Sequence, residues 1–284
     1  GNPPYGAELN SIEKKYLTKK YNIGTTDTAA LMMLQASRLT RQKGRIGLIV
    51  PKSFTYSSTW KDTRSMLLKE LTELIDVNKV WKDVKLEQVI YFQEKGQESN
   101  CYRSLERKEH EFVYLTDINK QECNDFGFYL NGIGAPELSI GRKILQIGAF
   151  LSDYTNNTRG AMLQSNVVDQ GPGLRVIGGK QLQRFSIRGE KGYIKTYDDL
   201  PLNSRVKPGN ILVQNIIAHI ANPVDHIKLI GTVIEKGEAD DLIILDTVNQ
   251  LANKSNYSSD FLLGILHSRL MNWYIYRFIF AKAI

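Results

Sequence analysis

The hydrophobic positions in the first part of the chain predict helices that alternate with buried strands. Residues 28–42 have apolar side chains at helical spacing, and Asp27 can cap this helix while Gly44 can end it. The apolar run Ile46–Val50 follows at once, which is typical of a buried strand in a covered parallel sheet. The same pattern then predicts one helix and two strands, at residues 59–74, 75–80 and 88–92. This order of elements indicates an α/β sheet.

Residues 94–137 are mostly polar and give a weaker signal. Residues 111–115 predict one more strand, whereas residues 117–134 show little periodicity, which indicates a linker. A proline then favours a helix over residues 136–147, because proline is preferred in the first turn of a helix. We therefore expect a domain boundary near residue 135.

The remaining residues predict a second domain that is rich in short strands. Apolar runs bounded by turn residues predict strands at residues 174–177, 185–187, 193–197, 210–214, 228–234 and 242–246. Residues 260–279 have apolar side chains at helical spacing and predict a closing helix that packs against the core. The predicted fold class is α/β: the C-terminal half of a Rossmann-like sheet at residues 1–135, followed by an α+β, β-rich domain at residues 136–284.

The stretch Asn2–Tyr5 combines residues that suit one reaction. Its two prolines make it stiff and nearly straight, because each ring fixes its own φ and restricts the preceding residue. Prolines have no N–H, so the Asn2 side-chain oxygen and the Pro3 carbonyl oxygen remain as acceptors beside an aromatic ring. Two acceptors on an aromatic NH₂ group would draw its lone pair out of conjugation, and the nitrogen could then attack an electrophilic methyl group. The alternative is an ordinary proline turn before a helix.

Composition limits the class of protein without choosing a function. The chain has 284 residues, 42% of them hydrophobic, and no apolar run long enough to span a membrane. Its cysteines and histidines have no metal-ligand spacing, so no metal site is predicted. These residues are Cys101, Cys123, His110, His219, His226 and His267. We expect a reducing compartment and therefore a cytoplasmic protein.

The net charge of +7 lies mostly in the second half of the chain. A basic face attracts polyanions, so DNA binding is one interpretation and an ordinary solvated face is the other. The best candidates for phosphate contacts lie in a stretch where basic residues outnumber acidic ones. They are Arg175, Lys180, Arg184, Arg188, Lys191 and Lys195.

Several motifs follow one another in a characteristic order. Asn-Pro-Pro-Tyr at residues 2–5 is followed by a helix, a glycine, a strand and Val-Pro at residues 50–51, and then by Val-Trp at residues 80–81. The second half adds Arg-Val-Ile-Gly-Gly-Lys at residues 175–180 and Leu-Leu-Gly-Ile-Leu-His-Ser at residues 262–268. In this order the motifs resemble those of the adenine-N6 DNA methyltransferases of the TaqI type, including the methyltransferase and specificity parts of type IIG restriction-modification enzymes.

The resemblance implies a role for each residue of the tetrapeptide. Asn2 and Pro3 would bind the adenine amino group, and Pro4 would hold their geometry. Tyr5 and Trp81 would stack on the two faces of an adenine that is flipped out of the duplex, because an amine inside the duplex is not accessible to the methyl donor. The family usually has phenylalanine where this chain has Trp81, and a buried core tryptophan is the alternative interpretation.

The resemblance also implies S-adenosylmethionine as the cofactor. Met32 falls where the family often has a phenylalanine near the adenosyl group. The family's Gly-rich cofactor turn and its acidic ribose-binding residue have no counterpart in the chain, since glycine pairs such as Gly178-Gly179 lack a strand–turn–helix setting. We therefore expect a fragment that is inactive alone, with an upstream part of the same polypeptide that completes the cofactor site and could include a nuclease.

Residues 136–284 would then form the target-recognition domain, with double-stranded DNA as the partner. Three other interpretations stay open. RNA and protein-glutamine methyltransferases share the Asn-Pro-Pro-Tyr motif, so the substrate could be of another class. The chain could instead be a non-catalytic DNA-specificity subunit, or a structural domain with no nucleic-acid role.

Overall fold

The computed structural model describes residues 1–24, 27–81, 87–195, 200–215 and 228–279. The chain divides into two units. Unit 1 consists of residues 1–147 together with residues 276–284, and unit 2 consists of residues 148–275. Helix α5 (Ala135–Gln146), which the sequence analysis assigns to the second domain, belongs to unit 1 in this division. The mixed α/β fold class is as predicted.

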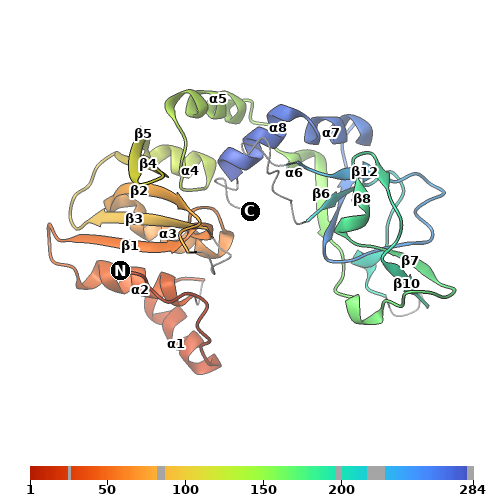
Figure 1. Ribbon diagram of the computed structural model, residues 1–284, viewed down its shortest axis with the longest axis horizontal. Coiled ribbons are helices and arrows are strands. Elements are labelled where there is room, and N and C mark those ends of the chain that lie inside the picture. Colours follow the sequence, from red (N-terminus) through yellow and green to blue (C-terminus); the bar gives the residue numbers. More distant parts are fainter. Residues whose placement is uncertain (25–26, 82–86, 196–199, 216–227, 280–284) are drawn as a thin grey trace. The chain divides into compact units, whose positions relative to one another are not determined.

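Unit 1 contains a five-stranded sheet (Figure 1). Its strands are β1 (Arg45–Pro51), β2 (Leu71–Asn78), β3 (Gln88–Glu94), β4 (Cys101–Lys108) and β5 (Glu111–Asn119). Their order across the sheet is β1-β3-β2-β4-β5, with β3 antiparallel to both of its neighbours, β4 parallel to β2, and β5 antiparallel to β4. Since β3 is reversed between them, β1 and β2 run in the same direction and end at the same edge of the sheet. We call this edge the carboxyl edge.

Strand β1 is present where residues 46–50 predict it, but the expectation of a parallel sheet around it is wrong on its β3 side. There β1 pairs antiparallel with β3 along its whole length. The chain passes from β2 to β3 through the short connection at residues 79–87, whereas a parallel pair would need a crossover of a dozen or more residues. Because β3 then inserts between β1 and β2, it becomes the antiparallel neighbour of both.

The helix predicted over residues 59–74 ends early. Helix α3 covers Lys61–Leu67 and a 3₁₀ turn follows at Leu68–Glu70, so that β2 begins at Leu71. The side chains of Leu71 and Leu74 are fully buried in the sheet. Their burial there favours strand pairing over continuation of the helix, although the apolar spacing alone suits both.

Helices pack around the sheet of unit 1 (Figure 1), and buried aromatic side chains fill its core. The α-helices of this unit are α1 (Ser11–Tyr21), α2 (Thr28–Leu39), α3 (Lys61–Leu67), α4 (Lys120–Phe126) and α5 (Ala135–Gln146). Helix α2 is confirmed, and it ends three residues before the predicted Gln42. The Phe54 ring meets the rings of Trp60, Tyr91 and Tyr129 edge to face, with centroids 5.5, 5.8 and 5.3 Å apart. These contacts join the turn after β1 to the start of α3, to β3 and to the segment that follows α4.

The linker predicted over residues 117–134 is wrong. Strand β5 continues to Asn119, whose side chain caps α4 and whose backbone N–H donates to Glu122. Beyond α4 the chain is buried again: Tyr129 is 2% and Ile133 0% exposed. Periodicity misses this region because its buried residues lie in a short helix and an irregular segment. Strand β4 was also not predicted.

Within its described residues, unit 2 contains two small sheets, a hairpin and short helices, the first of which is α6 (Leu151–Tyr154). Its strands are β6 (Thr155–Arg159), β7 (Leu174–Ile177), β8 (Leu182–Gln183), β9 (Ser186–Ile187), β10 (Gly192–Ile194), β11 (Ile211–Gln214), β12 (Gly231–Val233), β13 (Leu242–Ile244) and β14 (Val248–Asn253). One sheet has the order β12-β11-β14-β6, the other the order β10-β7-β13, and β8 pairs with β9. Leu212, Val248, Ile177 and Ile244 belong to one fully buried cluster, which joins the two sheets.

Most strands predicted for unit 2 exist, and several are shorter than predicted. Strand β7 matches residues 174–177, and the predicted runs at residues 185–187, 210–214, 228–234 and 242–246 each contain an observed strand. The run predicted at 193–197 overlaps β10, and its residues 196–197 lie outside the described residues. Strands β6, β8 and β14 were not predicted. Strand β6 reads Thr-Asn-Asn-Thr-Arg, which has no apolar alternation to detect.

The closing helix predicted over residues 260–279 is interrupted. Helix α7 covers Ser259–Leu266, α8 covers Arg269–Tyr274, and a π-helix continues from Ile275. The break occurs at Ser268, whose hydroxyl caps α8 by accepting a hydrogen bond from the Met271 N–H at 3.1 Å. Hydroxyl capping competes with an uninterrupted helix at this position. None of the helices within the described residues is both long and apolar enough to cross a bilayer.

Candidate active site and DNA interface

The tetrapeptide Asn2–Tyr5 follows a residue that is paired to β1. The Gly1 nitrogen donates to the Gly47 carbonyl oxygen at 2.6 Å, and the Ile49 N–H donates to the Gly1 carbonyl oxygen at 2.9 Å. Gly1 thus forms hydrogen bonds with the two residues that flank Leu48, and this is the hydrogen-bonding pattern of a parallel strand pair. The chain therefore leaves Gly1 in the direction of β1, and Asn2–Tyr5 lies toward the carboxyl edge of the sheet.

Helix α2 anchors the tetrapeptide. The Thr28 hydroxyl, in the first turn of α2, donates to the Pro4 carbonyl oxygen at 2.8 Å. Asp27 caps the same turn by accepting from the Ala29 N–H at 2.9 Å. Pro3 is buried and Tyr5 is half-buried, whereas the Asn2 side chain is exposed to solvent. The two oxygens that the sequence analysis assigns to amine binding therefore belong to a segment fixed at both ends, by β1 and by α2.

Trp81 leaves the sheet at the same edge. Pro51, the last residue of β1, and Asn78, the last residue of β2, both pair with Gln88 of β3. The carboxyl ends of the two strands are therefore level with each other. Trp81 follows Asn78 by three residues and is half-buried. The topology thus directs Tyr5 and Trp81 beyond the same edge, and such an edge is where open α/β sheets bind ligands.

Tyr56 and Glu87 add polar groups near this edge. The 3₁₀ turn Lys52–Thr55 follows β1 directly, and Tyr56 comes next. Burial and the nearby Glu87 carboxylate both raise the pKa of Tyr56. Its phenol therefore stays protonated at neutral pH and can donate a hydrogen bond.

Met32, the candidate cofactor contact, lies on α2 and is 48% exposed. It follows Thr28 by four residues, and side chains four residues apart share a helix face. Met32 therefore lies on the side of α2 that contacts the tetrapeptide, next to the turn that binds Pro4. An exposed thioether at this place suits contact with an aromatic or apolar part of a ligand. Its role in cofactor binding stays a prediction.

Three of the six candidate DNA contacts surround one turn of unit 2. Lys180 lies in the 3₁₀ turn Gly179–Gln181, and the Arg188 N–H donates to the Gln181 carbonyl oxygen at 2.8 Å. Lys191 is joined to the strand before that turn, since its N–H donates to the Val176 carbonyl oxygen at 2.8 Å. All three side chains are exposed. We call Lys180, Arg188 and Lys191 the basic turn.

The other three candidates lie apart from the basic turn. Arg175 is an exposed residue of β7, and the exposed Lys195 follows β10, the strand that pairs with β7. Arg184 lies at the opposite end of the β8–β9 hairpin from Arg188, because Gln183 and Ser186 are the last pair before its turn. Which of these side chains contact DNA stays a prediction.

Arg184 is tied to the end of helix α7. Its guanidinium donates to the His267 carbonyl oxygen at 3.1 Å and lies 5.7 Å from the Phe185 ring centroid. The Phe185 ring meets the His267 ring edge to face at 4.6 Å. His267 is 7% exposed, and burial together with the Arg184 charge lowers its pKa to about 4. The imidazole is therefore neutral at physiological pH.

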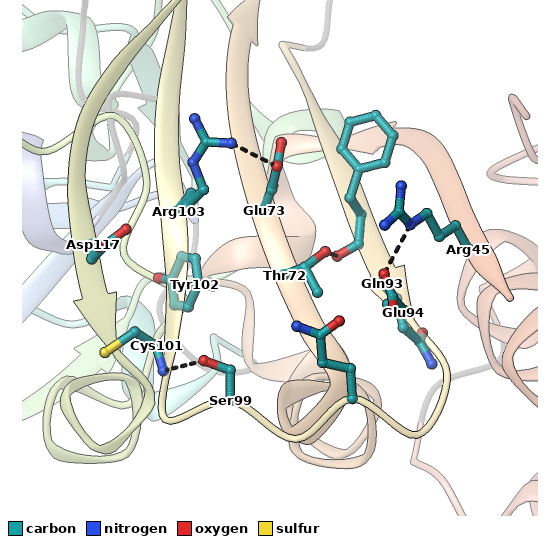
Figure 2. A pocket seen from close by; sticks show the side chains of 12 residues that line it. Arg45, Thr72, Glu73, Gln93, Glu94, Ser99, Cys101, Tyr102, Arg103 and Asp117 are labelled. Atoms are coloured by element: carbon teal, nitrogen blue, oxygen red, sulfur yellow. Dashed lines mark hydrogen bonds and ion pairs between the residues drawn. The ribbon is translucent and has the colours of Figure 1, made fainter. Parts of the chain in front are cut away.

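A hollow of about 580 Å³ lies toward the opposite edge of the same sheet (Figure 2). Arg45 begins β1 and Glu94 ends β3, so their ion pair of 2.8 Å marks the edge away from the tetrapeptide. In Figure 2, Arg103 points toward Glu73. These two residues form the second ion pair of this hollow, with a length of 3.0 Å. The sequence analysis assigned no function to these residues. Within the described residues, no cluster of three His, Cys, Asp or Glu side chains is suited to a metal ion.

Sequence reasoning missed the groups that hold the candidate site together. The hydroxyl of Thr28 and the pairing of Gly1 with β1 link segments far apart in the chain, and neither has a sequence motif. Lys52, which directly follows the Val-Pro pair, was not singled out, although a lysine next to an apolar run is a weak signal of a buried charge. Asn10 and Glu13, which form a capping box at α1, could have been found from their spacing.

Residues 1–96 match the sequence family described as Eco57I restriction-modification methylase. No curated protein matches the chain in sequence. Among solved structures, the type IIL restriction-modification enzyme MmeI in complex with DNA has a similar fold, with a TM-score of 0.57 and 11% identity over 94% of this chain.

Two further matches have lower TM-scores. A DrdV–DNA complex matches 98% of this chain at 11% identity and a TM-score of 0.47. A modification subunit of a putative type I restriction enzyme from Vibrio vulnificus YJ016 matches 44% of this chain at 16% identity and a TM-score of 0.34. The chain spans 42%, 39% and 28% of the lengths of MmeI, DrdV and the Vibrio subunit. The likeness to MmeI therefore supports the fold of this chain, which spans less than half of that protein.

Proposed function

We propose that the chain is part of a site-specific DNA methyltransferase of a restriction-modification system, which methylates the N6 amine of a flipped adenine. The observation that supports this most is the pairing of Gly1 with β1, which sends Asn2–Tyr5 to the sheet edge where Trp81 also emerges. The match of residues 1–96 to a restriction-modification methylase family supports the same reaction class. The proposed activity is that of the whole protein, because the chain spans only 42% of the length of MmeI.

The tetrapeptide would activate the amine by hydrogen bonding. The Asn2 side-chain oxygen and the Pro3 carbonyl oxygen would each accept one hydrogen of the adenine NH₂ group. This holds the nitrogen lone pair out of conjugation and aims it at the methyl donor. Preorganised groups of this kind are effective because they need no rearrangement as charge develops. The bond from Thr28 to Pro4 supports such preorganisation.

S-adenosylmethionine would supply the electrophilic methyl group. Met32 would contact it from the face of α2 that anchors Pro4, and its half-exposed thioether fits that role. The remaining cofactor contacts would come from other parts of the whole protein.

Tyr5 and Trp81 would stabilise the flipped base. Extrusion of a base from the duplex costs a few kcal/mol. Stacking on an aromatic side chain contributes about 1–3 kcal/mol per base, so two faces offset most of this cost. The basic turn and its neighbours would hold the phosphate backbone, with affinity that falls steeply as salt rises.

The test is methyl transfer by the full-length protein, with radiolabelled S-adenosylmethionine and separate pools of duplex DNA, RNA and protein. We expect label in duplex DNA, and a loss on the order of 100-fold for Asn2→Ala, the size typical of losing one preorganised hydrogen bond in a reaction site. Label in RNA or protein would assign the motif to another methyltransferase class. DNA methylation that is unaffected by Asn2→Ala would indicate a specificity subunit whose partner performs the reaction.

A further inference from the structure

Lys52 forms a buried cluster at the carboxyl edge with two carboxylates. Its ammonium group donates to Asp76 Oδ2 at 2.9 Å and to Glu87 Oε2 at 3.1 Å. The Lys52 side chain is 1% exposed, the Asp76 side chain 0% and the Glu87 side chain 21%. We call these three residues the Lys52 cluster. Such a cluster needs an explanation, because moving charges out of water costs free energy that a pairing only partly returns.

The Lys52 cluster joins the three chain segments that surround the candidate site. Lys52 directly follows β1, the strand that pairs with Gly1. Asp76 belongs to β2, which leads to Trp81, and Glu87 directly precedes β3. The Lys52 backbone N–H also donates to the Glu87 carbonyl oxygen at 2.9 Å. One side chain therefore connects the strand beside the tetrapeptide with the strand that leads to Trp81.

Further bonds fix the path from β2 to Trp81. Asp76 uses its second oxygen, Oδ1, to accept from the Asn78 N–H at 3.1 Å. Asn78 has a φ of 51°, a left-handed conformation that non-glycine residues adopt only when neighbouring contacts impose it. Two residues on, the Val80 N–H donates to the buried Gln88 side chain at 3.0 Å. The chain thus turns at Asn78 under the control of the carboxylate that Lys52 binds, and it reaches Trp81 from there.

We propose that the Lys52 cluster positions Trp81. The cluster thereby sets the distance between the Tyr5 and Trp81 rings, which would form the two aromatic walls of the base site. Lys52 would act through its bonds to Asp76 and Glu87. Stacking needs two ring faces at a fixed spacing, so a loose Trp81 would bind the base in many orientations and methylate it slowly. The proposal rests on the proposed function, because it takes Tyr5 and Trp81 as the walls of that site.

Glu87→Ala is the variant that tests this proposal. Lys52→Met would leave two buried carboxylates together and destabilise the whole fold, whereas Glu87→Ala keeps the Lys52–Asp76 pair. Glu94→Ala is a matched control. Glu94 is an ion-paired glutamate at the other end of the same strand, and its side chain is 19% exposed against 21% for Glu87.

The measurements use the full-length protein and duplex DNA with 2-aminopurine in place of the target adenine. For Glu87→Ala we expect kcat for methylation of the natural site to fall at least about tenfold, since small misplacements of a reacting group reduce rates strongly. The Kd for DNA should change by less than about twofold, because phosphate contacts are intact. Emission of 2-aminopurine should rise, and it should rise in Trp81→Ala as well, since a flipped base that is not stacked is not quenched. Glu94→Ala should change none of these quantities.

A double variant separates positioning from general loss of structure. If Glu87 acts through Trp81, then Trp81→Ala/Glu87→Ala should be no slower than Trp81→Ala alone. The proposal is overturned if the two losses multiply, or if Glu87→Ala behaves like Glu94→Ala while Trp81→Ala is impaired. Failure of the proposed function looks different, because the wild-type protein would then transfer no methyl group to DNA or Asn2→Ala would be fully active.

Discussion

The two edges of the sheet in unit 1 contain charged residues of the same kinds in opposite environments. At the carboxyl edge, Lys52 and Asp76 are almost completely buried, with side-chain exposures of 1% and 0%. At the other edge, Arg45 forms an ion pair of similar length with Glu94, but the arginine is 81% exposed. The comparison shows that the length of an ion pair does not by itself determine how much the pair contributes to stability. Burial decides how much stability is lost when one partner is removed, because a buried charge that loses its partner has no water to replace it.

The largest loss of stability should follow from removing the buried cation at the carboxyl edge. We expect Lys52→Met to lower the free energy of unfolding by about 3–5 kcal/mol, because Asp76 and Glu87 lose their cation. Urea denaturation of the wild type and the variant measures this difference. A loss below about 1 kcal/mol, the range of exposed ion pairs, would mean that solvent reaches the cluster.

His267 offers a pH-dependent version of the same test in unit 2. Its folded-state pKa of about 4 lies below the ordinary value of 6.5, so the unfolded chain binds a proton that the folded chain excludes. Stability should therefore fall as the pH drops from 6.5 toward 4. In thermal unfolding over the upper part of this pH range, His267→Leu should have a shallower pH dependence than the wild type. The control His110→Gln, at an exposed position between β4 and β5, should retain the slope of the wild type.

Removing the exposed ion pair at the other edge should change the stability only slightly. Arg45→Met removes an ion pair whose arginine is in contact with water, and we expect a loss of about 1 kcal/mol or less in the free energy of unfolding. The same urea titration measures it. A loss as large as that of Lys52→Met would show that exposure does not separate the two edges.

The smallest effect on stability should come from the basic turn, together with a clear effect on DNA binding. Lys180→Glu/Lys191→Glu should change the free energy of unfolding by less than about 0.5 kcal/mol, since both side chains are exposed. The slope of log affinity for duplex DNA against log salt should become smaller by about 2, one for each phosphate that a lysine no longer neutralises. Lys236→Glu, at an exposed turn of the same unit, is the control. An unchanged slope in the double variant would remove these lysines from the DNA interface.

Local signals in the sequence predicted the elements that local forces determine. Apolar spacing and the Asp27 cap predicted α2, a proline at the start of a helix predicted α5, and an apolar run predicted β1. Where tertiary interactions decide, the predictions were wrong. The insertion of β3 between β1 and β2 and the end of α3 before Leu71 both depend on pairing across the sheet. Helical and strand periodicities cannot be told apart in such short apolar runs.

The candidate site divides in the same way. The chemistry of Asn2–Tyr5 can be proposed from the residue types, because stiffness and missing N–H groups are properties of the local chain. The interactions that hold this site in place cannot be proposed from residue types, since Lys52 bonds to Asp76 and Glu87 across 24 and 35 residues of sequence. Thr28 meets Pro4 across 24 residues as well. Interactions of this kind depend on the order of strands, and that order was not predicted.

The most direct measurement is mass spectrometry of nucleosides from duplex DNA that has been incubated with the full-length protein and S-adenosylmethionine. If the oxygens of Asn2 and Pro3 activate an adenine amine, the modified nucleoside will be N6-methyladenosine in its deoxy form, and Asn2→Ala will reduce its yield on the order of 100-fold. A methyl group on any other atom, or an equal yield from Asn2→Ala, would contradict the assignment of Asn2–Tyr5 as the site of methyl transfer.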